Sequence, residues 1–139
     1  MNSFEVRPIG HVESPLVSRS AAPKQGDEGS PRAWLIVDGR FSAGLADIKT
    51  GDDLLILTWL DRADREVLTT HPRNDQSKPL MGIFSTRGPD RPNPIGLHRV
   101  KVISIVNRTR IEVDDLEALD MTPILDIKPV LKVNDTREG

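Results

Sequence analysis

The segment GIFSTRGPDRPNPIGL, residues 82–97, concentrates the side chains whose types and spacing could do chemistry. Two arginines, Arg87 and Arg91, lie among three prolines that fall within six positions, at 89, 92 and 94. Proline fixes φ and removes a backbone donor, so neither a helix nor a central strand is expected to run through this segment. The segment is therefore a stiff, charged loop. Its arginines either brace it, by bonding to carbonyls or to Asp90, or contact a ligand.

Other chemistry-bearing patterns are missing from the sequence. It has no GxxxxGK[ST] phosphate loop, no GxGxxG after a strand and no GxSxG elbow, which disfavours P-loop, Rossmann and serine-hydrolase sites. The three histidines, at positions 11, 71 and 98, show no metal-ligand spacing, so we expect no metal site. The absence of cysteine excludes disulfides and thiolate chemistry, and it fits a reducing compartment.

Length and charge narrow the class of protein further. We expect a single domain over residues 1–139, large enough to bury a core without a metal or disulfide. A net charge of −2 argues against a protein that coats nucleic acid non-specifically, although one basic face is enough to bind RNA. The N-terminal MNSFEVRPIGHVESP has no apolar leader and no run approaches membrane length. We therefore predict a cytoplasmic protein without membrane association.

The elements that must position the loop are predicted to be short strands. Apolar or alternating runs place strands at residues 4–12, 33–37, 54–60, 99–106, 110–114 and 123–133. The run at 54–60 is apolar on both faces and is expected to be central, residues 107–109 form a hairpin turn, and residues 42–48 form a short helical turn. This pattern predicts a mainly all-β fold, a small antiparallel β-barrel or a sandwich, with long loops at 13–31 and 62–80.

Two of the predicted strands also have predicted faces. In residues 99–106, Ile103 and Ile105 share the face of Arg99 and Lys101, so this face is expected to change from polar to apolar along the strand. In residues 123–133, one face carries Leu125, Ile127, Leu131 and Val133, and the other carries Asp126, Lys128 and Val130.

Two motifs, STRGPDRPNPIGL at 85–97 and LDMTPILDIKP at 119–129, resemble those of the TsaA-like family, also called YaeB-like or TrmO. The family reads close to ATRSPxRPNPIGL and LDGTPVLDIKPY, and the resemblance spans nearly the whole chain. It implies a small β-barrel that works as a homodimer. It also implies that S-adenosyl-L-methionine is used to methylate N6-threonylcarbamoyladenosine beside the anticodon of tRNA. The stiff loop would then be a preorganised wall for the cofactor and the target base.

The resemblance also implies which residues bind the cofactor. Arg87 matches the arginine of the family's ATR motif and Leu97 ends the loop, and both are expected to contact S-adenosyl-L-methionine. The other expected cofactor-binding residues fall in three short segments: Pro23, Lys24 and Gln25; Asp61 and Arg62; and Glu117, Ala118, Leu119 and Asp120.

The chemistry implied by the resemblance demands mainly in-line positioning, because a sulfonium cofactor already carries a good leaving group. The acceptor would be a ureido nitrogen, whose proton a nearby carboxylate can help to remove. The candidate catalytic carboxylates are Asp120, Asp126 and Asp61. The alternative for Asp126 is a surface ion pair with Lys128.

The chain departs from the family pattern at three positions. Asp61 replaces a histidine, Met121 a glycine and Val130 a tyrosine. The glycine-to-methionine change is expected to hinder a positive φ and to add bulk beside the pocket. Two alternatives stay open: a barrel that binds S-adenosyl-L-methionine without transferring its methyl group, and a methyltransferase with a different acceptor. The chain ends shortly after DIKPVLKV, so we expect it to lack the additional C-terminal domain of longer family members.

Overall fold

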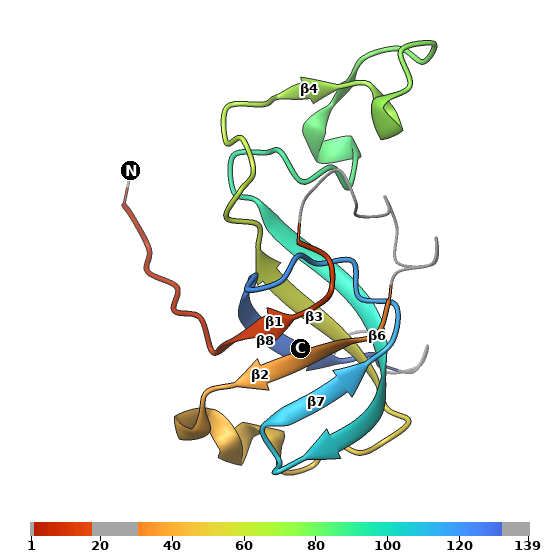
Figure 1. Cartoon of the computed structure of the whole chain (residues 1–139). Coiled ribbons are helices and arrows are strands. Elements are labelled where there is room, and N and C mark those ends of the chain that lie inside the picture. Colours follow the sequence, from red (N-terminus) through yellow and green to blue (C-terminus); the bar gives the residue numbers. More distant parts are fainter. Residues whose placement is uncertain (1, 18–30, 132–139) are drawn as a thin grey trace.

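Six strands form a closed antiparallel ring in the computed structural model, which describes residues 2–17 and 31–131 (Figure 1). The order around the ring is β1-β2-β7-β6-β3-β8. The strands are β1 Gly10–Glu13, β2 Ala33–Val37, β3 Asp53–Trp59, β6 Ile95–Val106, β7 Arg110–Val113 and β8 Pro123–Pro129. The predicted mainly-β antiparallel barrel is confirmed.

The core fills the inside of this ring. Along β3 the buried positions alternate, with Leu54, Ile56 and Thr58 at most 3% exposed. As expected for the run at 54–60, β3 is paired on both sides, with β6 and with β8. Because successive side chains of a strand point to opposite faces, the residues between these three are left on the outside of the barrel.

Shorter elements lie outside the ring. Strands β4 Thr69–Thr70 and β5 Met81–Gly82 pair as a small projecting sheet, and two 3-10 helices lie next to them, η4 Pro72–Asn74 and η5 Ile83–Ser85. The predicted helical turn is present as the 3-10 helix η3 Gly39–Leu45, capped by the Asp38 carboxylate, which accepts a hydrogen bond from the backbone N–H of Arg40. No helix in residues 2–17 or 31–131 is long and apolar enough to cross a membrane.

Strand β1 closes the ring, but it starts later than predicted. The expected strand at 4–12 is observed at 10–13, because Pro8 cannot donate a ladder hydrogen bond and residues 2–9 form no strand. Gly10 pairs with Val37 on one side and with Ile124 on the other. A Cβ at position 10 would collide with the carbonyl oxygen of Ile36, so only glycine permits this close approach of β1 to β2.

Two β-bulges change the predicted faces. In β6, Val102 pairs with Val113 and Ser104 with Glu112, so Ile103 is the extra residue. As a result Ile105 packs against the core instead of continuing the outer face of Arg99 and Lys101, and that prediction was wrong.

The second bulge lies in β8, where Ile124 pairs with Thr58 and Asp126 with Leu57, so Leu125 is the extra residue. Ile124 is fully buried and Ile127 packs against the core, whereas Leu125 was expected to share the face of Ile127. The bulge thus places Ile124 and Ile127, three positions apart, on the same interior surface.

Prolines and turns set the remaining boundaries. β6 begins at Ile95, directly after Pro94 and four residues before the predicted start, so a strand does enter the end of segment 82–97. β8 ends at Pro129, before the predicted end at 133. The predicted hairpin turn is confirmed at residues 107–109, where Asn107 and Arg108 both have a positive φ, 52° and 62°.

The substitution Gly10→Ala tests the closure of the ring. We expect the free energy of unfolding to fall by about 3 kcal/mol, because the new Cβ forces β1 away from β2. The matched control is Gly44→Ala, where a Cβ meets nothing within 4 Å, and its effect is expected to stay within about 0.5 kcal/mol. Chemical denaturation measures both, and equal stability of the two variants would contradict the assignment.

Candidate functional site

A cavity of about 460 Å³ runs along β6, and we call it the β6 cavity. Two separate parts of the sequence meet there: Arg87 from the proline-rich loop, residues 83–94, and Leu97 from the start of β6 lie opposite Glu117 from the loop after β7. All three were expected to bind a cofactor. The other lining residues are Asp53, His98, Arg99, Val100, Lys101, Asp114 and Asp115.

Arg91 braces the proline-rich loop from within. Its Nη1 donates to the carbonyl oxygens of Thr86 and Gly88, each at 3.1 Å, and its Nη2 donates to that of Ile83 at 2.9 Å. The guanidinium thereby ties together the backbone of residues 83–88 through three carbonyl oxygens. For Arg91 the bracing alternative is the one observed.

The turn after β3 braces the same loop from outside. Arg65 donates through Nε to the carbonyl oxygen of Pro92 at 2.7 Å and through Nη2 to Oδ1 of Asn93 at 3.0 Å. Asp90 accepts a hydrogen bond from the backbone N–H of Asp64 at 2.8 Å. The guanidinium of Arg65 also lies 5.2 Å from the ring centre of Trp59. The loop is therefore held on two sides.

Arg87 differs from Arg91 in its exposure and in its hydrogen-bond partners. Its side chain is exposed and lines the β6 cavity, and within residues 2–17 and 31–131 its guanidinium has no hydrogen-bond or ion-pair partner. A braced loop thus presents an arginine that does not take part in the bracing. Such a guanidinium is suited to hold a carboxylate or phosphate through two parallel hydrogen bonds.

The loop after β7 forms the facing wall. Leu116 and Ala118 are buried in the core, at 0% and 3% exposed, which turns Glu117 between them toward the cavity. At its start the loop is tied to β6, because the backbone N–H of Lys101 donates to Oδ1 of Asp114 at 2.7 Å. Asp115 has a positive φ of 49°, an unusual conformation for a residue with a side chain, and it also lines the cavity.

The far end of this loop is tied to β1 and the residues that follow it. The backbone N–H groups of Asp120 and Met121 donate to the carbonyl oxygens of Leu16 and Val12, each at 2.7 Å. Oδ1 of Asp120 accepts from the N–H of Ser14 at 3.0 Å. The position of Glu117 is therefore set by both its buried neighbours and the closing strand.

The lining carries charges of both signs. Four carboxylates, Asp53, Asp114, Asp115 and Glu117, face three cations, Arg87, Arg99 and Lys101. Lys101 is already paired, because its Nζ lies 3.0 Å from Oδ1 of Asp53. A cavity with both signs of charge and exposed apolar surface at Leu97 suits a ligand that carries separate positive and negative groups.

His98 also lines the cavity, and the sequence analysis did not select it. Its Nε2 lies 2.8 Å from Oγ1 of Thr58, a residue with no exposed surface. A Cβ at position 96 would lie 2.7 Å from the same Nε2, so the glycine makes room for the ring. Burial lowers the pKa of His98 from 6.5 to about 4, so the imidazole is neutral at pH 7. A single histidine has no spacing pattern that would have revealed it.

The other expected cofactor-binding residues that the structure describes do not line the β6 cavity. Asp61 is exposed in the turn after β3, and Arg62 donates through Nη1 to the carbonyl oxygen of Val17 at 3.1 Å. Ala118 is buried in the core, and the carbonyl oxygen of Leu119 accepts from Oγ1 of Thr122 at 2.7 Å. Pro23, Lys24 and Gln25 fall outside the described residues.

The three candidate catalytic carboxylates are not brought together. Asp61 and Asp120 lie as described above, and Asp126 is exposed on β8, where its Oδ2 is 3.6 Å from Nζ of Lys128. The surface ion pair considered for Asp126 is thus present. None of the three lines the β6 cavity, and their catalytic role stays a prediction.

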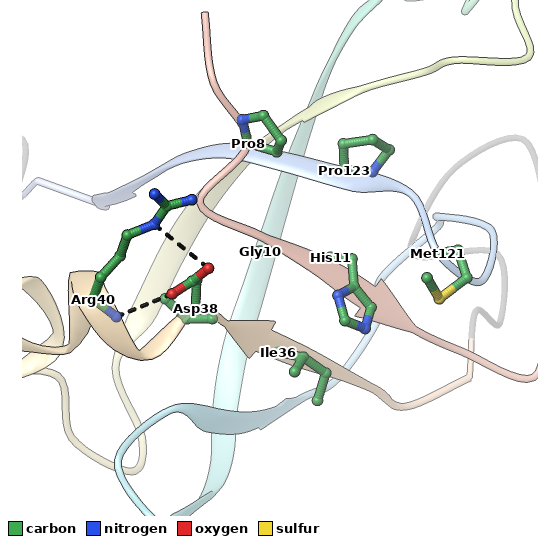
Figure 2. A pocket seen from close by; sticks show the side chains of 9 residues that line it. Pro8, Gly10, His11, Ile36, Asp38, Arg40, Met121 and Pro123 are labelled. Carbon is green, nitrogen blue, oxygen red and sulfur yellow. Dashed lines mark hydrogen bonds and ion pairs between the residues drawn. The ribbon is translucent and has the colours of Figure 1, made fainter.

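Met121 adopts the conformation that it was expected to hinder. Its φ is 69°, in the left-handed region, and its side chain is 58% exposed. It borders a second hollow, of about 430 Å³, that lies over β1 and β2 beside His11 (Figure 2). The Asp38–Arg40 ion pair, at 3.5 Å, borders the same hollow, and none of the expected cofactor-binding residues that the structure describes does. A methionine at this φ carries backbone strain.

Replacing each arginine of the loop in turn should distinguish the one that holds the loop from the one that only lines the cavity. We expect Arg91→Ala to lower the free energy of unfolding by about 2 kcal/mol, because three carbonyl oxygens lose a charged donor. Arg87→Ala should change it by less than about 0.5 kcal/mol. Urea denaturation compares the two variants, and a loss for Arg87→Ala as large as that for Arg91→Ala would contradict the distinction.

Relief of the strain at position 121 should stabilise the protein. Met121→Gly is expected to raise the free energy of unfolding by about 0.5 to 1 kcal/mol, since glycine adopts a positive φ without a steric penalty. The gain is limited by the greater entropy of glycine in the unfolded chain. Met121→Leu keeps the strain and serves as the control in the same thermal or urea melts. No difference between these two variants would disprove the strain.

Comparison with known proteins agrees with this architecture. The tRNA-methyltransferase O N-terminal domain family matches residues 11–136. A probable S-adenosyl-L-methionine-binding protein of Archaeoglobus fulgidus is 39% identical over 136 residues, which cover 98% of this chain and 36% of that protein. An S-adenosyl-L-methionine-binding protein of the same organism is 37% identical over 88% of this chain and 86% of its own length.

The fold is also that of a solved structure. The crystal structure of TrmO from Pseudomonas aeruginosa superposes with a TM-score of 0.74 at 27% identity, covering 100% of this chain and 62% of the TrmO chain. The chain thus spans less than two thirds of the length of TrmO and of the first Archaeoglobus relative. With a match over most of its residues, this chain belongs to the tRNA-methyltransferase O N-terminal domain family.

Proposed function

We propose that this protein is an S-adenosyl-L-methionine-dependent N-methyltransferase whose cofactor site is the β6 cavity. The acceptor we propose is N6-threonylcarbamoyladenosine beside the anticodon of tRNA, and the working unit is a homodimer, as the family resemblance implies. The observation that carries the proposal is the meeting of Arg87, Leu97 and Glu117, three expected cofactor-binding residues, in one cavity. Membership of the family and the names of the relatives support it.

The residues of the cavity fit this cofactor. Its volume of about 460 Å³ lies within the roughly 300–1,000 Å³ of small-molecule sites. A methionine moiety offers a carboxylate, for which Arg87 has no competing partner in the described part of the chain, and an ammonium group, which suits Asp115 or Glu117. The exposed Leu97 provides apolar surface for the adenosine. When bound, the cofactor supplies a methyl group on a positively charged sulfur.

The chain's own contribution is mostly positioning. The proline-rich loop is held by Arg91 and Arg65, so little entropy is lost when Arg87 engages a ligand. Fixed placement of donor and acceptor can supply up to roughly 7–11 kcal/mol of the barrier. Among the candidate bases, Asp120 is the first to test, because it lies on the loop that carries Glu117, with one oxygen held by Ser14.

Isothermal titration calorimetry of Arg87→Ala tests the cofactor site. We expect saturable binding of S-adenosyl-L-methionine by the wild type and a loss of about tenfold or more in the variant, since a charged hydrogen-bonding partner is removed. Arg40→Ala removes an exposed arginine outside the β6 cavity and is the matched control. Absence of binding by the wild type, or an unchanged affinity in Arg87→Ala, would refute the assignment.

The same preparations test the transfer step. tRNA that carries N6-threonylcarbamoyladenosine is incubated with the protein and S-adenosyl-L-methionine, and its nucleosides are analysed by mass spectrometry. We expect the wild type to add one methyl group to this nucleoside. With Asp120→Asn we expect a smaller fraction of the nucleoside to be methylated. Cofactor binding without methylation of any nucleoside would favour a barrel that only binds the cofactor. Methylation of another nucleoside would retain the transferase and change the acceptor.

A further inference from the structure

His98 is a polar residue of the β6 cavity to which the family resemblance assigns no role. It lies next to Leu97 on β6, and its ring reaches Thr58 on β3 across the glycine at position 96. The hydrogen bond to Thr58 occupies Nε2. Within the described residues Nδ1 has no hydrogen-bond partner, and His98 is one of the residues that line the cavity.

We infer that His98 binds the ligand of the β6 cavity through Nδ1, and that Thr58 positions its ring for this contact. The inference rests on the proposed function, because it takes S-adenosyl-L-methionine as the ligand. Either tautomer leaves Nδ1 available, as a donor when Thr58 donates to Nε2 and as an acceptor when Thr58 accepts from it. Thr58 has no exposed surface, so its hydroxyl is held in place by the core of the barrel.

The surroundings of His98 suit a cationic ligand. The charged groups that line the cavity with it are Asp53 from β3, Arg87 from the proline-rich loop, Arg99 and Lys101 from β6, and Asp114, Asp115 and Glu117 from the loop after β7. Burial holds the pKa of His98 at about 4, so the ring adds no fourth positive charge near neutral pH. An uncharged hydrogen-bonding group therefore contacts the ligand without repelling a sulfonium.

Nitrogen-15 NMR of the wild-type protein is the direct test. We expect the Nδ1 resonance of His98 to move when S-adenosyl-L-methionine is added, while the resonances of His11 and His71, which lie outside the cavity, stay in place. The affinity should stay constant between about pH 5.5 and pH 7, because a histidine with its usual pKa would titrate in that range and His98 does not.

Variants test the same contact by calorimetry. His98→Ala and His98→Gln remove the ring, and we expect S-adenosyl-L-methionine to bind His98→Ala about tenfold more weakly. Thr58→Val removes only the hydroxyl and should weaken binding by about threefold, whereas Thr58→Ser keeps the hydroxyl and should restore it. His11→Gln is the control histidine and should bind as the wild type does.

Two outcomes would overturn the inference, and they differ in what else they overturn. If the wild type binds S-adenosyl-L-methionine but the Nδ1 resonance does not move, or His98→Ala binds within about twofold of the wild type, the role of His98 is wrong and the proposed function stands. If the wild type shows no binding, the proposed function fails and the inference fails with it.

Discussion

The close contact between β1 and β2 at Gly10 is the constraint on which the rest of the molecule depends. β1 has four residues, yet it joins β2 to β8 and so turns an open sheet into a ring with no free edge. The carbonyl oxygens of Val12 in β1 and of Leu16 after it also accept hydrogen bonds from Met121 and Asp120, at the end of the loop that carries Glu117. One wall of the β6 cavity is thus held by the strand that closes the barrel.

At the opposite wall, some arginines hold the loop and another is left to bind a ligand. Arg91 and Arg65 donate hydrogen bonds to backbone carbonyl oxygens and to Asn93, and these bonds fix a loop that has no strand pairing of its own. The loop that these bonds fix places Arg87 at the cavity. A site built on a loop reaches in this way the fixed geometry that ligand binding requires.

Much of the fold was predictable because side-chain alternation is a local property of a strand. Residues 33–37 form a strand with the predicted bounds, and residues 110–113 do so to within one residue. The bulges at Ile103 and Leu125 were not predictable, since each is fixed by the partner strand and leaves no mark in the local pattern. The close approach of β1 to β2 was likewise not predictable, because it depends on Gly10 meeting Ile36, a contact between segments 26 residues apart in sequence.

The candidate site was predictable only where a motif surrounds the residue. Arg87, Leu97 and Glu117 were selected through family motifs, whereas His98 becomes visible only with Thr58 and Gly96 around it.

The bulge at Ile103 also divides β6 into two parts whose side chains alternate in opposite phase. Before it, Leu97, Arg99 and Lys101 line the cavity, and after it Ile105 belongs to the interior. The extra residue interrupts the period of two, so Arg99 and Lys101 face outward before the bulge, whereas Ile105 faces the core after it. One strand thereby supplies a wall of the candidate site with its first part and, through its pairing with β7, a side of the core with its second.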